Sequence, residues 1–369
     1  MGHKVDMKKK WRVLAFSGLT ALIVGCSHLG YYVQAAHGQF SLLAEAKPID
    51  EWLSDPEVSG TLKDKLAKVQ EIRRFAAREL ALPDNESYKS YADLKRPYVL
   101  WNVVATEEFS LKPMKWCFPV AGCVNYRGYY SKEDAMAYAA ELRAQRYDVQ
   151  VGGVPAYSTL GFFNDPVLST FIRYPEGELA RLVFHELAHQ VVYAQGDTRF
   201  NEAFAVAVEE VGVERWLAKY GDEKMRNSYR DYQRRKEGFL ALLTKCRDDL
   251  EENYARDVDD HEKRKRKAAI FESLKEQYQV LKAQWGGYGG YDRWFAEPLS
   301  NAHLSAISTY HDLVPGFRAL LAREKSLDKF YAAVRSLSSL DKERRHEQLA
   351  GLAKSHQMAT ESVEARLSR

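Results

Sequence analysis

The chain has 369 residues, 46% of them hydrophobic and 12% aromatic, enough to bury a substantial core in one elaborated domain or two. Its formal net charge of +3 comes from the first 25 residues, which contribute +4 and leave −1 for the rest. A nearly neutral body gives no electrostatic case for binding nucleic acid, and no fixed-period repeat indicates a solenoid.

The start of the chain has the pattern of an export signal. A basic stretch precedes an apolar run over residues 11–24, which is too short for a comfortable membrane span. Its Ile-Val-Gly-Cys ending resembles the lipobox of bacterial lipoproteins, which implies that Cys26 becomes the lipidated N-terminus. Ser27 is typical of outer-membrane sorting. We therefore expect a signal peptide over 1–25 and a lipid-anchored body in the bacterial cell envelope, at the outer membrane facing the periplasm; an uncleaved signal anchor is the alternative.

Residues 26–130 are expected to form a mainly helical part that ends in a disulfide loop. Apolar residues at helical spacing predict a helix over 66–76 that Pro83 terminates. Residues 91–111 are rich in β-branched and aromatic side chains and fit either a strand or a buried helix. Cys117 and Cys123 flank a loop-like stretch, and in an exported protein this favours a disulfide over a metal site.

Residues 131–220 are expected to form the centre of the domain. Ser131 and Asp134 predict a capped helix that runs to about Arg146. The following segment, "YDVQVGGVPAYSTLGFF", predicts one or two strands with a bend at its paired glycines. Two helices are then expected, over about 176–195 and 201–219.

Residues 221–285 are dense in both charge signs with apolar residues between them, which predicts long solvated helices in an antiparallel pair. Cys246 has no evident partner there and is expected to be a core residue. Two or three more helices should occupy 286–357, followed by a frayed tail. The sequence thus predicts a single domain over 26–369 of α+β class, predominantly α-helical.

The segment "HELAHQ" carries a metal-binding pattern. His185 and His189 lie one turn apart on one helical face, and Glu186 points sideways, toward a metal-bound water. If the helix continues to Gly196 and the chain turns there, an antiparallel return brings Glu202 back to the level of His189. Two imidazoles and a carboxylate leave one position open, as in catalytic zinc sites, so we expect one zinc ion with Glu186 as the general base.

The same motifs carry a family resemblance. "HELAHQ" followed by "NEAFA" is similar to the motif pair of M1-type zinc aminopeptidases, although the interval between the motifs is shorter here and no GAMEN-like segment is present. The closer resemblance is to a family of bacterial lipoproteins described as predicted aminopeptidases. It rests on "WCFPVAGCVNYRGYY", "AYSTLGFFNDPVL", "GDTRFNEAFAVAVEE" and "NAHLSAISTYHDLVPGF", between about Cys26 and Phe317. It implies a metallopeptidase with a gluzincin-like core, in which a small sheet accompanies the HExxH helix and the following glutamate helix.

Other residues have weaker signals. Glu209, two turns after Glu202, is a candidate to accept the outer N–H of a histidine ligand; a solvated glutamate is the alternative. Tyr310 is the first candidate for the donor to a developing oxyanion, and His311 and Tyr288 are the next candidates. Residues 157–161 precede the metal helix, where gluzincins place a substrate-binding edge strand; an ordinary sheet edge is the alternative. For a substrate ammonium group the candidates are Glu178, Asp165 and Glu209, with a turn role favoured for Asp165.

These patterns together predict a membrane-tethered zinc peptidase that acts on peptides, an aminopeptidase by resemblance. A zinc endopeptidase is one alternative. The other is a non-catalytic lipoprotein in which zinc staples two helices and the charged helices bind a partner; Glu186 argues against it, since a structural site has no use for that carboxylate. No nucleic-acid partner is expected, and the sequence identifies no protein partner.

Overall fold

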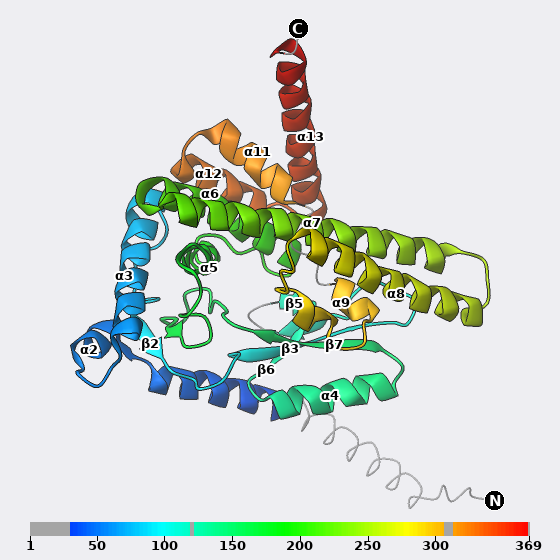
Figure 1. The fold of residues 1–369 in the computed structure, drawn as a ribbon, viewed down its shortest axis with the longest axis horizontal. Helices are drawn as coiled ribbons and strands as arrows, with labels where there is room; N and C mark the ends of the chain where they lie inside the picture. The colour runs from blue at the N-terminus through cyan, green and yellow to red at the C-terminus, as the bar shows by residue number, and fades with distance from the viewer. Residues whose placement is uncertain (1–29, 119–121, 306–312, 368–369) are drawn as a thin grey trace, which may run out of the picture.

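The computed structural model describes residues 30–118, 122–305 and 313–367. The protein is of α+β class and predominantly helical, as predicted, and its helices surround small sheets (Figure 1). The helices are residues 30–45, α2 (Ile49–Ser54), α3 (Gly60–Leu80), α4 (Lys132–Ala144), α5 (Glu176–Ala188), α6 (Thr198–Tyr220), α7 (Glu223–Ala255), α8 (Asp260–Gln284), the 3-10 helix η1 (Asp292–Phe295), α9 (Asn301–Ser305), α11 (Val314–Glu324), α12 (Leu327–Ser338) and α13 (Lys342–Leu367).

Three small sheets accompany these helices. An antiparallel sheet has the order β6-β3-β7, a mixed one the order β1-β2-β8, and β4 pairs with β5 as a hairpin. The strands are β1 (Lys47–Pro48), β2 (Ser90–Ala92), β3 (Leu100–Thr106), β4 (Trp116–Phe118), β5 (Gly122–Val124), β6 (Arg127–Tyr129), β7 (Asp148–Val154) and β8 (Val167–Leu168). The segment 91–111, for which strand and helix were both open, thus contains β2 and β3.

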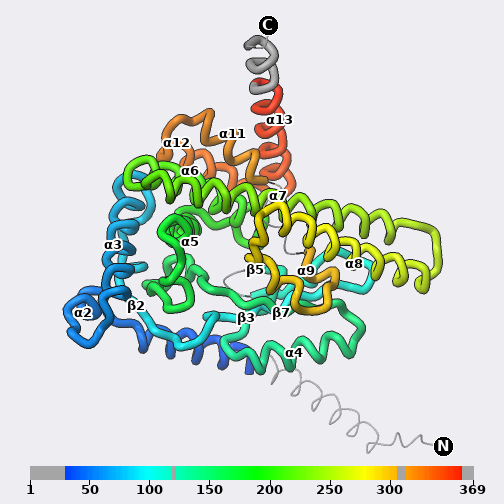
Figure 2. The backbone as a smooth tube through the Cα atoms, in the orientation of Figure 1, coloured from blue at the N-terminus to red at the C-terminus, as the bar shows by residue number. Residues whose placement is uncertain are grey.

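The main core lies between α3, α5, α6 and the C-terminal helices α11 and α12. Apolar residues cover most of the circumference of α6, which is typical of a helix enclosed by others. Figure 2 shows α5 beneath α6, with the antiparallel sheet and α4 on the opposite side of α5. A second cluster of buried side chains joins α7 to α8. These helices form the predicted long pair, and Cys246 is buried between them as expected.

The capping residues correctly predicted where a helix begins, whereas the paired glycines wrongly predicted a bend in a strand. The Asp134 N–H donates to Oγ of Ser131 at 3.1 Å, so α4 begins where the sequence indicated. The predicted bend at Gly152-Gly153 is wrong, because both glycines pair in register with β3 inside one continuous strand, β7. A Cβ at Gly153 would lie 2.2 Å from the Tyr98 ring, so glycine is needed there for close packing.

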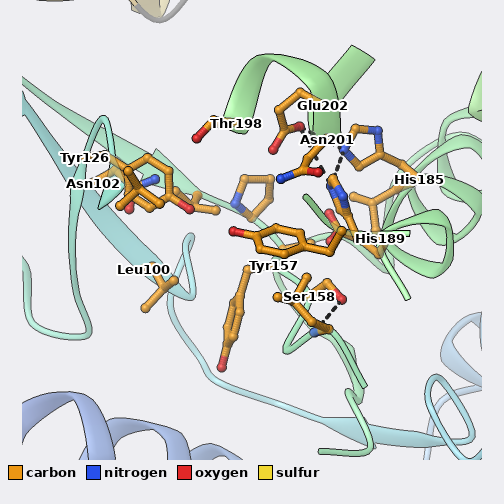
Figure 3. A pocket seen from close by; sticks show the side chains of 18 of the residues that line it. Leu100, Asn102, Tyr126, Tyr157, Ser158, His185, His189, Thr198, Asn201 and Glu202 are labelled. Carbon is orange, nitrogen blue, oxygen red and sulfur yellow. Dashed lines mark hydrogen bonds and ion pairs between the residues drawn. The ribbon is translucent and has the colours of Figure 1, made fainter. Parts of the chain in front are cut away.

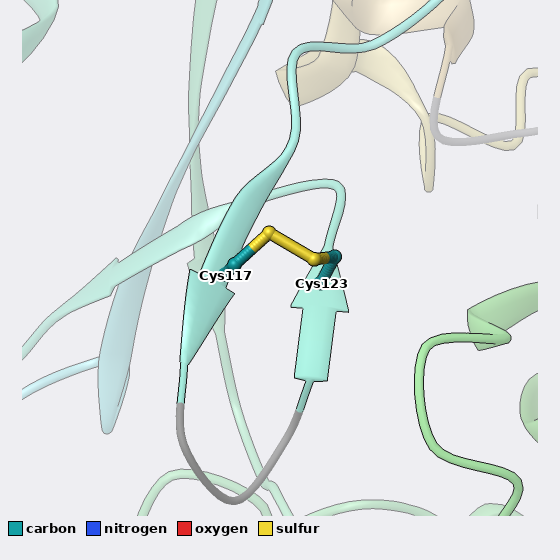
Figure 4. Close-up of a disulfide and its surroundings, with 2 residues drawn as sticks. All are labelled: Cys117 and Cys123. Atoms are coloured by element: carbon teal, nitrogen blue, oxygen red, sulfur yellow. A yellow bond between two sulfur atoms is a disulfide. The ribbon is translucent and has the colours of Figure 1, made fainter.

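The cysteines and the two ends of the chain were also predicted from the sequence. Cys117 and Cys123 form the expected disulfide, which joins β4 to β5 (Figure 4). The frayed tail expected beyond Gln357 is wrong in its position, since α13 continues to Leu367. Cys26 and the signal segment lie outside the described residues. Within the part that is described, no helix is both long and apolar enough to cross a bilayer.

Candidate metal centre

Helices α5 and α6 pack side by side and carry the predicted metal ligands. Gly212 on α6 permits this close approach, since a Cβ there would lie 2.6 Å from the ring of Phe184 on α5. His185 lies in the last turn of α5, His189 caps that helix, and Glu202 lies in the first turns of α6. Two adjacent helices thus supply three ligand atoms to one place.

The three ligand atoms form a compact triangle. Nε2 of His185 lies 3.2 Å from Nε2 of His189 and 3.3 Å from Oε2 of Glu202, and the remaining edge, His189 to Glu202, is 3.8 Å. Two imidazole nitrogens and a carboxylate oxygen at these separations could hold a divalent metal ion. The side chains converge at one end of the pocket in Figure 3.

Glu209 contacts one of the candidate ligands, His185. Its Oε2 lies 2.9 Å from Nδ1 of His185 and accepts a hydrogen bond from Arg181 Nη1, also at 2.9 Å. Lys236 Nζ lies 3.6 Å from the other carboxylate oxygen, and the Glu209 side chain is fully buried. The solvated alternative is therefore wrong. With Nδ1–H donated to Glu209, His185 presents the lone pair of Nε2 to the triangle once it has released its second proton.

The electrostatics of the triangle favour a positive charge. Burial lowers the pKa of His185, but hydrogen bonds with Glu202 and Glu209 outweigh it and raise that pKa to about 10. Burial together with the neighbouring His185 lowers the pKa of His189 to about 4, despite the opposing charge of Glu202. The pKa of Glu202 is below its usual value because the two histidines overcome the effect of burial. Such a set stabilises a cation among its donor atoms.

The route between the two helices differs from the predicted one. We expected α5 to continue to Gly196, but it ends at Ala188, with His189 as its cap. Asn201 holds the connecting loop: its side chain accepts from the Ala194 N–H at 2.7 Å and donates to the Ala194 carbonyl at 2.9 Å. These two bonds hold the connecting segment against the start of α6. Glu202 therefore reaches the histidines through a folded loop rather than an antiparallel helical return.

Segments outside α5 and α6 also contact the loop that connects these two helices. Asp197 caps α6 through the Phe200 N–H at 3.3 Å, and its carboxylate lies 2.8 Å from Nε2 of His346 on α13. The disulfide hairpin packs on the same turn, since a Cβ at Gly122 would approach the Gly196 nitrogen to 3.0 Å. Segments before and after the two metal helices in the chain thus fix the position of Glu202.

Glu186 lies at the metal end of the same pocket. Its side chain is buried, with 9% of the residue exposed. Burial is the main cause that raises its pKa to about 7; the neighbouring His185 lowers this pKa and Glu202 raises it. A carboxylate with a pKa near neutrality can both accept and return a proton at neutral pH.

The pocket around this centre has a volume of about 350 Å³. Besides α5 and α6 it is lined by Asn102 on β3, Tyr126 after β5, and the segment 154–158, which begins with the last residue of β7 (Figure 3). Tyr126 and Tyr193 face the pocket near Glu202; burial first, and the charge of Glu202 second, raise the pKa of each, so both remain O–H donors. The sequence analysis missed both tyrosines, since nothing in their local sequence distinguishes them from structural ones.

The other predicted site residues have mixed outcomes. Residues 157–161 form no strand, because Thr159 and Leu160 are in turn hydrogen bonds with Asp165 and Ser158, so the edge strand next to the pocket is β7. Asp165 is buried and accepts from the Thr159 N–H at 3.0 Å, in accord with its turn role. Tyr288 and Glu178 do not line the pocket. Tyr310 and His311 lie outside the described residues.

Comparison with known proteins identifies a family. A family model described as "Putative aminopeptidase" matches residues 30–349, which is most of the chain. No curated protein and no solved structure matches significantly.

Proposed function

Since the chain belongs to the family described as "Putative aminopeptidase", we propose that it is a zinc-dependent peptidase. In this proposal His185, His189 and Glu202 bind one zinc ion, Glu186 is the general base, and peptides are the substrates. Glu209 is a positioning residue that fixes the tautomer of His185.

The triangle of ligand atoms carries this proposal. Two nitrogens bound to tetrahedral zinc at about 2.0–2.1 Å lie about 3.3 Å apart. The two Nε2 atoms lie 3.2 Å apart here, and Oε2 of Glu202 completes a face of similar size. Two facing ring nitrogens at this distance repel unless a cation or a proton lies between them. The donor set and its dimensions therefore fit zinc, with a fourth position open toward the pocket.

The residues of the chain would divide the reaction between them. Bound zinc would supply a Lewis acid that polarises the scissile carbonyl and makes a water molecule acidic enough to attack. Glu186 accepts the proton of that water and then donates it to the departing amine. An O–H donor stabilises the oxyanion; Tyr126 and Tyr193 are the candidates in the described pocket, and Tyr310 remains a prediction. The free edge of β7, which pairs only with β3 in the described chain, suits an extended substrate backbone.

One observation keeps an endopeptidase as the second candidate. An aminopeptidase needs a carboxylate for the substrate ammonium group, and the only carboxylates that line the described pocket are Glu186 and Glu202. Both have other tasks in the proposed mechanism. Glu209, named as a candidate from the sequence, is occupied by Arg181 and His185. The family description favours release of N-terminal residues, and the pocket lining favours internal cleavage.

Paired peptides separate these candidates. The zinc-loaded full chain in mild detergent is incubated with peptides that have either free or acetylated N-termini, and the products are identified by mass spectrometry. We expect stepwise loss of residues from the free peptides alone, because an aminopeptidase needs the ammonium group. Internal cuts in both sets would establish the endopeptidase instead. Absence of cleavage in both sets, with zinc bound, would count against the peptidase proposal itself.

We also propose that the protein is anchored by lipid at Cys26 to the outer membrane and faces the periplasm. The lipobox-like sequence ending at Cys26 supports this. Replacement of Cys26 by serine removes the thiol that would carry the lipid. We therefore expect the variant either to appear in the soluble fraction or to keep its signal peptide, which raises its mass. Cys246→Ser is the matched control, because this cysteine is buried between α7 and α8. Unchanged fractionation and mass of Cys26→Ser would refute the anchor.

A further inference from the structure

A second cavity, of about 240 Å³, lies beside the metal pocket. Four residues line both cavities: Asn102, Tyr126, Val154 and Thr198. In Figure 3 three of them, Asn102, Tyr126 and Thr198, lie across the pocket from His185. A substrate bound at the metal centre could therefore extend a group into this second cavity, which we call the amide pocket.

The sheet explains which side chains reach the amide pocket. Asn102 and Val104 on β3 pair with Gly152 and Gln150 on β7. Since residues two apart in a strand share a face, these four positions form one patch on one face of the sheet. All four line the amide pocket. Gly152 contributes no side chain, and the Gln150 amide lies over it: a Cβ at Gly152 would be 3.2 Å from Nε2 of Gln150.

Three carboxamide groups meet in this cavity, those of Asn102, Gln150 and Asn125. The Asn102 Oδ1 atom is buried and has no hydrogen-bond partner. The Gln150 and Asn125 side chains are half-buried and belong to the same lining. A buried amide oxygen in a protein normally has a partner, so the unpaired Asn102 oxygen beside two further amides indicates a polar ligand.

The lining also limits the ligand's chemistry. The other polar residues there are Tyr126, Thr198 and Ser305, and none of the described residues that line the cavity is charged. A charged group would lose its hydration without gaining a counter-ion. An apolar group would leave the amides without water or any other partner. A carboxamide, which both donates and accepts, satisfies both conditions.

We propose that the amide pocket is a specificity subsite that binds the side chain of a substrate residue near the scissile bond and selects glutamine or asparagine. This inference rests on the proposed peptidase function. Amide groups of the pocket donate to the substrate carbonyl oxygen and accept from its NH2 group. Selection follows because near-isosteric methionine leaves these groups unpaired, whereas glutamate brings an uncompensated charge.

The test uses the zinc-loaded full chain and pentapeptides in which glutamine, methionine or glutamate occupies each position in turn. At one position we expect kcat/KM for glutamine to exceed that for methionine and for glutamate by about tenfold or more. Gln150→Leu should reduce this preference to about threefold or less, with zinc content and Tm unchanged. Gln145→Leu is the matched control, since Gln145 is exposed at the end of α4 and should keep the preference. Equal rates for the three side chains at every position would overturn the subsite while leaving the peptidase proposal standing.

A binding measurement keeps the subsite testable if no peptide is cleaved. The zinc-loaded Glu186→Gln variant is titrated calorimetrically with the glutamine and methionine peptides. About tenfold tighter binding of the glutamine peptide, lost when Gln150→Leu is added, supports the amide pocket even if the peptidase proposal has failed. Equal affinities would overturn the amide pocket.

Discussion

Glu186→Gln is expected to lower kcat by about 10²–10⁴-fold, the usual contribution of a positioned general base. The amide has the size of the carboxylate but cannot take a proton from water. Glu186 is not one of the three ligand atoms of the triangle, so zinc content should remain at one ion per chain. The measurement is kcat on a cleaved peptide together with zinc determined by atomic absorption.

Glu176→Gln is the control for this substitution. Glu176 lies in the first turn of the same helix and accepts a hydrogen bond from Trp216 Nε1 at 3.1 Å, which a glutamine oxygen can also accept. Its kcat should stay within about twofold, as for a surface substitution outside the site. If Glu186→Gln keeps zinc and retains full activity, another group is the base. If it keeps every cellular role of the native protein, zinc serves only to join two helices.

Glu209→Gln is expected to have the largest effect on stability and also to weaken metal binding. Its buried carboxylate compensates Arg181 and lies close to Lys236. Breaking a fully buried pair costs about 3–5 kcal/mol; because 20% of the Arg181 side chain is exposed, we expect about 2–3 kcal/mol in the free energy of unfolding. Loss of the charged acceptor for His185 Nδ1–H should weaken zinc binding by about 10–100-fold.

The next residue provides a matched control. Glu210 forms a bidentate pair with Arg318 at 2.7 Å, but 55% of the Arg318 side chain is exposed. Glu210→Gln should therefore change the free energy of unfolding by at most about 1 kcal/mol and leave zinc affinity unchanged. Denaturant unfolding of the zinc-free proteins and competition with a zinc chelator measure the two effects. Equal zinc affinities for the two variants would show that Glu209 does not position His185.

The sequence anticipated features that depend on neighbours along the chain. His185 and His189 are one helical turn apart whatever the rest of the fold does, so their shared face could be read directly. The cap at Ser131 and the charge pattern of α7 and α8 are local in the same sense. Glu202 could be predicted as a third candidate ligand because a short connection after His189 limits where the next helix can lie. The predicted path of that connection was wrong, since α5 ends at Ala188 and Asn201 holds the following loop through its bonds to Ala194.

Contacts between distant segments could not be predicted in this way. The sequence placed Glu209 on a helical face, but the burial that joins it to Arg181 and Lys236 depends on how α5, α6 and α7 pack. The amide pocket depends on the register of β3 with β7, which sets Asn102 opposite Gly152.

Periodicity along the chain therefore predicted most of the helices, the cap of α4 and the candidate metal ligands, because each follows from geometry within a few turns. Only the tertiary structure decided which side chains enclose the metal centre and which lie unpaired beside it. The physical reason is that strand register and helix packing are set by burial summed over the whole core, and no single segment carries that information.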